Sequence, residues 1–195
     1  MPRQEKVFCS RCGCIHEITA HGSINAALEP ELKAAAASGE LFTWQCPQCG
    51  TVNLAKYPLL YHDPEAKLLI VLSEVPINAD SCPEGYTGRL VGTVGELIEK
   101  IKIFDAGLDD IVIEMCKFVT LQDLGREVDL KFFKMDGPDS DLTFTFPENG
   151  QMQLLAVPLR TYQDCAGILQ RNPAVRSGIT GIARIDAAWL SQHIG

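Results

Sequence analysis

The feature that most constrains this chain is a doubled motif, Cys-x-x-Cys-Gly, at Cys9–Gly13 and again at Cys46–Gly50. Two thiolates can reach one metal ion from a tight turn when two residues separate them, and the glycine that follows allows the positive φ that such a turn needs. Because both pairs agree in spacing and in the trailing glycine, we expect one structural zinc ion. Its predicted ligands are Cys9, Cys12, Cys46 and Cys49. Four thiolates leave no open coordination position, so this metal should not perform hydrolysis.

Other uses of these thiols stay open. Paired motifs of this kind also bind iron, and each pair alone would be typical of a redox-active dithiol. Cys14 could replace Cys12 as a ligand, although the Cys12-Gly-Cys14 spacing is poorer; the favoured interpretation is a cysteine packed in a strand. His16 and His21 flank the strand expected after the first pair. Either could contact the ligands from outside, but the favoured interpretation is a solvated or core histidine.

Charge and hydropathy limit the partners. The net charge is −8, and no Lys/Arg-rich run supplies the basic face that a phosphate backbone needs. The start, MPRQEKVF, has no secretory signal, and the longest apolar stretch, Leu68–Leu72, is too short to span a bilayer. We therefore expect a cytoplasmic protein with no membrane partner, in which the eight cysteines are metal ligands or free thiols.

The segment 1–75 is predicted to be a zinc ribbon with a helical insertion. The stretch EPELKAAAASG indicates a helix, with Pro30 in its first turn and Gly39 just past its end. Strands are expected over residues 14–20 and 41–45, and in VNLAKY. The stretch LLYHDPEAKLLIVL predicts a hairpin that turns around Asp63-Pro64-Glu65.

The segment 90–195 is predicted to be α+β, either as a second domain or packed with the first. Proline and glycine are dense over residues 75–89, which suggests a boundary. Thr93 and Glu96 form a capping-box signature, followed by two helices, or one broken at Gly107, to about Leu124. An antiparallel β-meander with one buried face comes next, with a hairpin signal at Asn149-Gly150, and a C-terminal helix closes the chain. The alternating apolar positions of the meander are Val128, Leu130, Phe132, Leu142, Phe144, Phe146, Met152, Leu154 and Ala156.

The cysteine motifs and three further stretches resemble the CpXC-domain family of bacterial and archaeal proteins. The stretches are LEPELKAAAASGEL, YPLLYHDPE and KIKIFDAGLDD, so the resemblance covers roughly residues 7–130. It implies that the four predicted ligands are the motif cysteines of the family. It implies no activity, because the family is functionally uncharacterised. Ser10 stands where the family name leads one to expect proline, which should loosen the first motif without removing a ligand.

The leading hypothesis is a non-catalytic structural-zinc protein that serves as an interaction or assembly module, with an unknown protein partner or a second copy. The sequence contains no Gly-Lys-Ser/Thr phosphate loop. No local signature links Cys82, Cys116 or Cys165 to a histidine.

Two alternatives belong to other classes. An enzyme could have a site between the ribbon and the C-terminal part, using His62 and Asp63 as a base and its orienting group, or the cluster of Asp105, Asp109 and Asp110. The simpler interpretation is that Asp63 starts a turn, which His62 caps, and that Asp105 or Asp109 caps a helix. A nucleic-acid-binding zinc ribbon is the other alternative, and the net acidity disfavours it.

Overall fold

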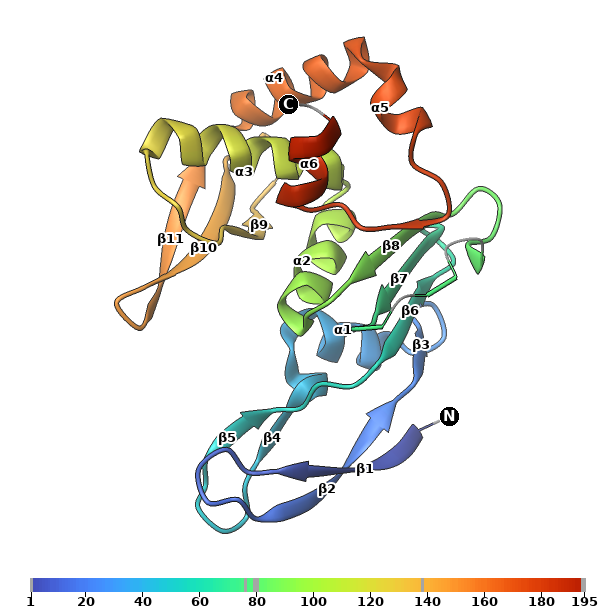
Figure 1. Ribbon diagram of the computed structural model, residues 1–195, viewed down its shortest axis with the longest axis vertical. Coiled ribbons are helices and arrows are strands. Elements are labelled where there is room, and N and C mark those ends of the chain that lie inside the picture. Colours follow the sequence, from blue (N-terminus) through green and yellow to red (C-terminus); the bar gives the residue numbers. More distant parts are fainter. Residues whose placement is uncertain (1, 76, 79–80, 138, 194–195) are drawn as a thin grey trace. The chain divides into compact units, whose positions relative to one another are not determined.

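The computed structural model describes residues 2–75, 77–78, 81–137 and 139–193 (Figure 1). The chain divides into two compact units, residues 1–98 and 99–195, called here the N-terminal and the C-terminal unit. Helices and mostly antiparallel strands occur in both units, which confirms the α+β class.

Two short antiparallel hairpins of the N-terminal unit carry the cysteine motifs. In the first, β1 (Pro2–Phe8) pairs with β2 (Ile15–His21); in the second, β4 (Thr43–Gln45) pairs with β5 (Val52–Leu54). We call these the knuckle hairpins, and the loops Cys9–Gly13 and Cys46–Gly50 the first and second knuckle. The sequence did not predict β1, because its residues are mostly polar and exposed.

The predicted helical insertion is present between the two hairpins. Helix α1 (Pro30–Ser38) has proline at its start and ends at Gly39, whose φ is 85°. A Cβ on Gly39 would come within 3.1 Å of Ile98 Cδ1, so both the conformation and the space favour glycine. The expected strand 41–45 is shorter than predicted, because a 3₁₀ turn, η1 (Glu40–Phe42), precedes β4.

A sheet forms the core of the N-terminal unit. The strands β6 (Leu59–Asp63) and β7 (Leu68–Leu72) form the predicted hairpin. β3 (Ser23–Asn25) pairs parallel to β6, and β8 (Thr87–Val91) pairs parallel to β7. Sequence periodicity gave neither parallel pair, because each joins segments that are distant in the chain.

Helix α2 (Val94–Asp105) begins with the predicted capping box. The Glu96 N–H donates to the Thr93 hydroxyl at 3.1 Å, and the Glu96 carboxylate accepts from the Gly92 N–H at 2.7 Å. In the usual capping box the glutamate carboxylate accepts from the N–H of the capping residue, which here would be Thr93. In this helix it accepts from Gly92, one residue earlier.

The C-terminal unit packs helices on a three-stranded meander. Its sheet has the order β11-β10-β9 and is antiparallel throughout, as predicted. The two predicted helices after residue 93 are separate, and the closing helix α6 is present; α4, α5 and β12 were not predicted. The elements are α3 (Asp110–Leu124), β9 (Lys131–Met135), β10 (Leu142–Glu148), β11 (Gln151–Val157), α4 (Leu159–Arg171), α5 (Pro173–Ser177), β12 (Ile182–Ala183) and α6 (Ala187–His193).

The buried face of the meander differs from the prediction in β11. Asn149 and Gly150 both have positive φ, and their turn pairs β10 and β11 so that Leu155 faces Phe144 across the two strands. Met152 and Leu154 consequently lie on the other face, where they are 63% and 65% exposed. Apolar alternation alone had suggested that Met152, Leu154 and Ala156 point inward, but Ala156 is exposed as well.

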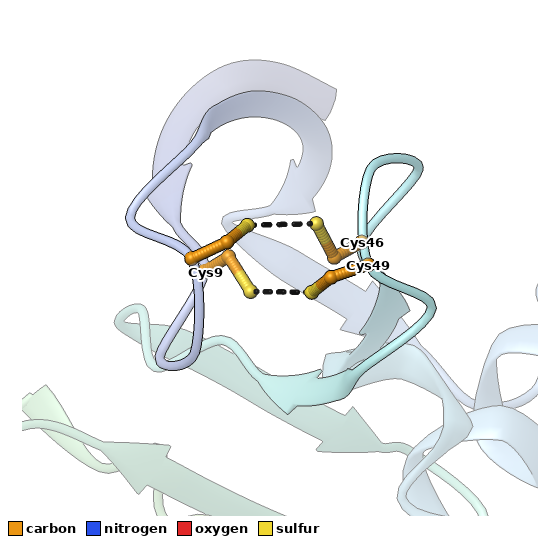
Figure 2. A group of neighbouring side chains, drawn as sticks. Cys9, Cys46 and Cys49 are labelled. Carbon is orange, nitrogen blue, oxygen red and sulfur yellow. Dashed lines mark hydrogen bonds between the residues drawn. The ribbon is translucent and has the colours of Figure 1, made fainter.

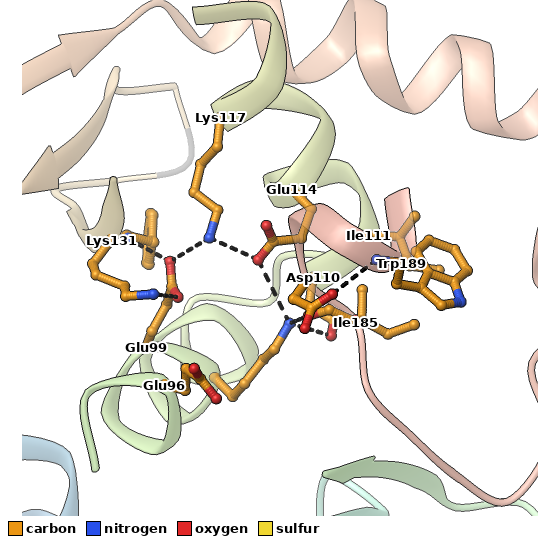
Figure 3. Close-up of polar contacts among 12 residues, drawn as sticks. Glu96, Glu99, Asp110, Ile111, Glu114, Lys117, Lys131, Ile185 and Trp189 are labelled. Carbon is orange, nitrogen blue, oxygen red and sulfur yellow. Dashed lines mark hydrogen bonds and ion pairs between the residues drawn. The ribbon is translucent and has the colours of Figure 1, made fainter. Parts of the chain in front are cut away.

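A network of charged side chains is buried in the C-terminal unit (Figure 3). Lys100 Nζ lies 2.8 Å from Asp110 Oδ2 and donates to the Ile185 carbonyl at 2.9 Å. Lys117 Nζ lies 2.7 Å from Glu114 Oε1 and 3.1 Å from a carboxylate oxygen of Glu99. All of these lysines and carboxylates are less than a tenth exposed, and each forms an ion pair with a group of opposite charge.

The same network joins helix to sheet within the unit. Glu99 Oε1 accepts the Phe132 N–H of β9 at 2.7 Å, and Lys131 Nζ lies 3.8 Å from Glu99 Oε2. Burial raises the pKa of Glu114, although Lys117 and Lys100 oppose this effect. Burial alone would lower the pKa of Lys117, but the nearby Glu99 and Glu114 carboxylates raise it, so this lysine stays charged.

Candidate metal centre

The two knuckles have the same backbone geometry. In the first, the Cys9 N–H donates to the Cys14 carbonyl and the Gly13 N–H donates to the Cys9 carbonyl, both at 2.9 Å. The second knuckle repeats both bonds at the same distances, from Cys46 and Gly50. The φ of each glycine is 69°. The repeated sequence motif is thus a repeated loop, as the trailing glycines predicted.

The four predicted ligand atoms lie close together. The sulfurs of Cys9, Cys12, Cys46 and Cys49 are all within 4.8 Å of one another, and these residues could hold a metal ion. Figure 2 shows sulfurs of the two hairpins facing one another in pairs; the Cys9–Cys49 and Cys12–Cys46 distances are both 3.5 Å. Metal–sulfur bonds of about 2.3 Å in a tetrahedron give sulfur–sulfur distances of about 3.8 Å, so the donor set fits a tetrahedral metal.

None of the four sulfurs is in a disulfide, since all eight cysteines are free. Cys9 and Cys46, the first cysteines of their knuckles, are buried, whereas Cys12 is exposed. Each sulfur comes from a loop held by backbone hydrogen bonds.

Backbone amides favour the thiolate at the first cysteine of each knuckle. The Cys12 amide, helped by the Arg11 N–H at 3.4 Å, lowers the pKa of Cys9 to about 6. Burial opposes ionisation of Cys46, but the Cys14 thiol and the Cys49 and Gln48 amides lower its pKa. The surroundings of Cys9 and Cys46 therefore favour the thiolate form.

Asn53 on β5 is a member of the site that sequence reasoning missed. Its Oδ1 accepts the Ser10 N–H at 2.9 Å and the Ser10 hydroxyl at 2.8 Å, and its Nδ2 donates to Cys9 Sγ at 3.7 Å and to the Thr51 carbonyl at 2.9 Å. The only available signal was a single polar residue between Val52 and Leu54. Asn53 thus ties the first knuckle to the second hairpin.

Ser10, where the family name led us to expect proline, ties the first knuckle to Asn53 of the second hairpin. A proline at this position could not donate the backbone bond to Asn53, because proline has no N–H. The two hydrogen bonds from Ser10 therefore hold the loop in another way.

The nearby histidines differ in their surroundings. His16 stacks on Trp44 of the other hairpin, with ring centroids 5.4 Å apart and planes 13° from parallel. His21 pairs with Pro2, at the end of the first hairpin away from the knuckle. His16 therefore supports the packing of the two hairpins.

His62 and Asp63 do not form a base and its orienting group. They are neighbours on β6, so their side chains point to opposite faces. Asp63 accepts from the Ala66 N–H at 3.1 Å and pairs with Lys33 at 3.0 Å, which confirms its role in the turn. The expectation that His62 caps this turn was wrong: its Nε2 lies 3.2 Å from the Tyr86 hydroxyl.

Helix capping explains one member of the aspartate cluster. Asp109 is the N-cap of α3 and accepts from the Ile111 and Val112 N–H groups, as the simpler interpretation predicted. Asp110 is buried and pairs with Lys100 in the charge network. Two surface cavities, of about 130 and 410 Å³, are lined by residues 56–58 with 72–75 and by residues between 118 and 129. Neither cavity is lined by the candidate acid–base residues.

The remaining thiols lie apart from the knuckles. Cys82 Sγ is 3.7 Å from the Tyr86 carbonyl oxygen. Cys116 and Cys165 are buried in the core of the C-terminal unit, so packing explains both.

The chain belongs to the CpXC protein family. The family model matches residues 7–117, which is more than half of the chain and includes both knuckles. Searches of curated proteins and of solved structures found no match. Within the part of the chain that the structure describes, no helix combines the length and apolar character needed to cross a membrane.

Proposed function

We propose that this chain is a non-catalytic structural-zinc protein in which Cys9, Cys12, Cys46 and Cys49 bind one Zn²⁺. The observation that carries the proposal is the convergence of four sulfurs from two hairpins within 4.8 Å. A bound zinc ion would cross-link two hairpins that bury little apolar surface of their own. Four thiolates fill a tetrahedral shell, which supports a structural role over a hydrolytic one.

Elemental analysis of the purified protein tests this site. We expect one zinc per chain in the wild type and almost none in a Cys9→Ser/Cys46→Ser variant, which lacks one ligand from each knuckle. Cys82→Ser is the matched control and should retain the zinc. Four thiolates also suit iron, so both metals are measured. A wild-type protein with iron, or with neither metal, would contradict the proposal.

The cysteines also support a cytoplasmic location. Eight free thiols, including sulfurs 3.5 Å apart, are typical of a reducing compartment.

We further propose that the protein assembles with a second copy of itself through β11. Among the described residues, β11 is an edge strand paired with β10 alone. None of its residues, Gln151–Val157, is charged, although the chain carries a net charge of −8. Two copies with the same net negative charge repel each other, and an uncharged strand is a place where they approach without bringing like charges together.

The strand is complementary to itself. If two copies pair antiparallel about Leu154, Met152 of each copy faces Ala156 of the other. This pairing satisfies the outer backbone groups of the edge and covers the exposed apolar side chains of β11.

Light scattering coupled to size-exclusion chromatography tests this assembly. We expect a dimer for the wild type and a monomer for Leu154→Lys, because the substitution places two like charges opposite each other. Leu28→Lys, at an apolar residue that is 79% exposed in the N-terminal unit, should remain a dimer. A monomeric wild type, or a dimer that survives Leu154→Lys, would refute the assembly through β11.

A further inference from the structure

The two knuckles differ in the residue that follows the trailing glycine. In the second knuckle this residue is Thr51, whose hydroxyl lies 3.2 Å from Cys49 Sγ of its own loop. In the first knuckle it is Cys14, whose sulfur lies 3.1 Å from Cys46 Sγ of the other loop. The backbone geometry and the Cys-x-x-Cys-Gly positions are the same, so the thiol of Cys14 is an addition to the repeated motif.

Cys14 is a fifth sulfur beside the four predicted ligands. The group of four mutually close sulfurs contains Cys12 and not Cys14. The Cys14–Cys46 distance of 3.1 Å is nevertheless shorter than the 3.5 Å that separates Cys12 from Cys46. A disulfide bond is about 2.0 Å long, so the two sulfurs need to approach by only about 1 Å.

Access to this pair is uneven. Cys14 is half-buried, whereas Cys46 is 1% exposed. A Cβ built on Gly13 meets no atom within 4 Å, so the loop beside Cys14 is open. A small oxidant can therefore reach the pair from the Cys14 side, where the sulfur is not one of the four ligands.

We propose that Cys14 and Cys46 form an oxidant-sensitive thiol pair that releases the metal when a hydroperoxide oxidises it. Hydrogen peroxide oxidises one thiol to a sulfenic acid and is reduced to water. The other sulfur attacks the sulfenic sulfur, a sulfur–sulfur bond forms, and the hydroxyl group leaves as a second water after it takes up a proton. Two thiols thus lose two electrons to one peroxide.

The consequence for the metal follows from the ligand set. Cys46 leaves the coordination shell, and three remaining thiolates bind the ion more weakly. A thiol reductant restores Cys46 and the site. This part of the inference rests on the proposed zinc site, whereas formation of the disulfide does not.

Zinc release under peroxide tests the proposal. Zinc-loaded wild-type protein is treated with hydrogen peroxide, release is followed with a chromogenic zinc chelator, and disulfides are mapped by peptide mass spectrometry. We expect release together with a Cys14–Cys46 disulfide, both reversed by a thiol reductant. Cys14→Thr, which copies the second knuckle, and Cys14→Ser should release zinc several-fold more slowly. Cys82→Ser should behave as the wild type.

Two results would overturn the pair. One is equal release from the wild type and both Cys14 variants; the other is a disulfide that joins Cys9 to Cys12 or Cys46 to Cys49 instead. If the purified protein contains no metal, the proposed function fails while the inference stays testable. Disulfide mapping on that metal-free protein then decides whether Cys14 and Cys46 react with each other.

Discussion

The knuckle hairpins and the C-terminal unit both hold polar groups close together, but they differ in how much apolar surface they bury. The strands of the hairpins are mostly exposed and bury few side chains, among them Trp44 and Asn53. The C-terminal unit buries a continuous apolar cluster and encloses charged groups that partner one another. The hairpins instead gather four sulfurs that could hold a metal ion, and we expect their stability to depend on that ion.

This difference in apolar burial indicates which interactions stabilise each region. A segment with little apolar burial cannot offset the conformational entropy lost on folding and needs a metal or another cross-link. A unit with a continuous core can also hold a set of buried charges, provided that each has its partner. We therefore expect chelation of the metal to destabilise the hairpins, and the removal of one charged side chain from the buried network to destabilise the C-terminal unit.

The largest expected effect is that of metal removal. The chain has two tryptophans, Trp44 in the second knuckle hairpin and Trp189 in α6, so each unit has its own fluorophore. In a Trp189→Phe variant, chelation should shift the Trp44 emission to longer wavelength, because structural zinc sites contribute about 10–16 kcal/mol in small zinc domains. In a Trp44→Phe variant, the Trp189 emission should not change. An unchanged Trp44 emission after complete metal removal would contradict the idea that the hairpins depend on the metal for their structure.

The next effect concerns the charge network. Glu99→Ala should destabilise the C-terminal unit by about 3–5 kcal/mol, because it leaves Lys117 with one partner fewer and the Phe132 N–H without its acceptor. Urea unfolding followed by Trp189 in the Trp44→Phe background measures this change.

Asp129→Ala is the control for that measurement. Asp129 is 71% exposed and pairs with Lys131 at 3.0 Å, so its loss should cost less than about 1 kcal/mol. Equal effects of the two substitutions would show that the buried network adds nothing beyond a surface ion pair.

A smaller effect is expected at Asn53. Asn53→Ala removes the tether to Ser10 and a donor to Cys9, so zinc affinity should fall by about 10–100-fold, the usual loss when a partner of a metal ligand is removed. Competition with a chelator of known affinity measures it. Gln45→Ala, which removes a bond to the Gly50 carbonyl, is the control and should bind zinc as the wild type does. An unchanged zinc affinity in Asn53→Ala would show that the hydrogen bonds of Asn53 do not contribute to metal binding.

The smallest effect concerns acid stability of the N-terminal unit. Burial acts against ionisation of Asp63, but the Ala66 N–H and Lys33 outweigh it and lower the pKa of the carboxyl below 3.8. Its contribution to stability is therefore full above pH 3.8 and is lost as the pH falls through the lowered pKa.

Asp63→Asn should accordingly destabilise the protein by about 1 kcal/mol at neutral pH, and this deficit should shrink as the pH falls. Unfolding followed by Trp44 at several pH values checks it, with the exposed Glu65→Gln as control. A deficit that does not vary with pH would exclude the Asp63 carboxylate as its cause.

Local signals predicted much of the fold correctly. Pro30 and Gly39 bound α1, Thr93 precedes α2, and Asn149-Gly150 makes the hairpin turn. Each signal acts through the conformation or hydrogen bonds of a few neighbouring residues, which the sequence displays directly.

Features that depend on distant residues could not be predicted. The parallel pairs β3–β6 and β7–β8 join separated segments, and the contact of Asn53 with Ser10 crosses between hairpins. In β11 both alternating sets contain apolar residues, so only the register set by the turn decides which set faces inward. The four motif cysteines were predictable because the spacing within each pair is itself the local signal.

The insertion of α1 between the knuckles also orders events during synthesis. The ribosome completes Cys12 well before Cys46, and at about 5–20 residues per second the interval lasts about 2–7 s. During that time the nascent chain offers only two of the four predicted ligands, Cys9 and Cys12, which make half of a tetrahedral shell. Stable capture of an ion therefore has to wait until α1 and the second pair have been translated.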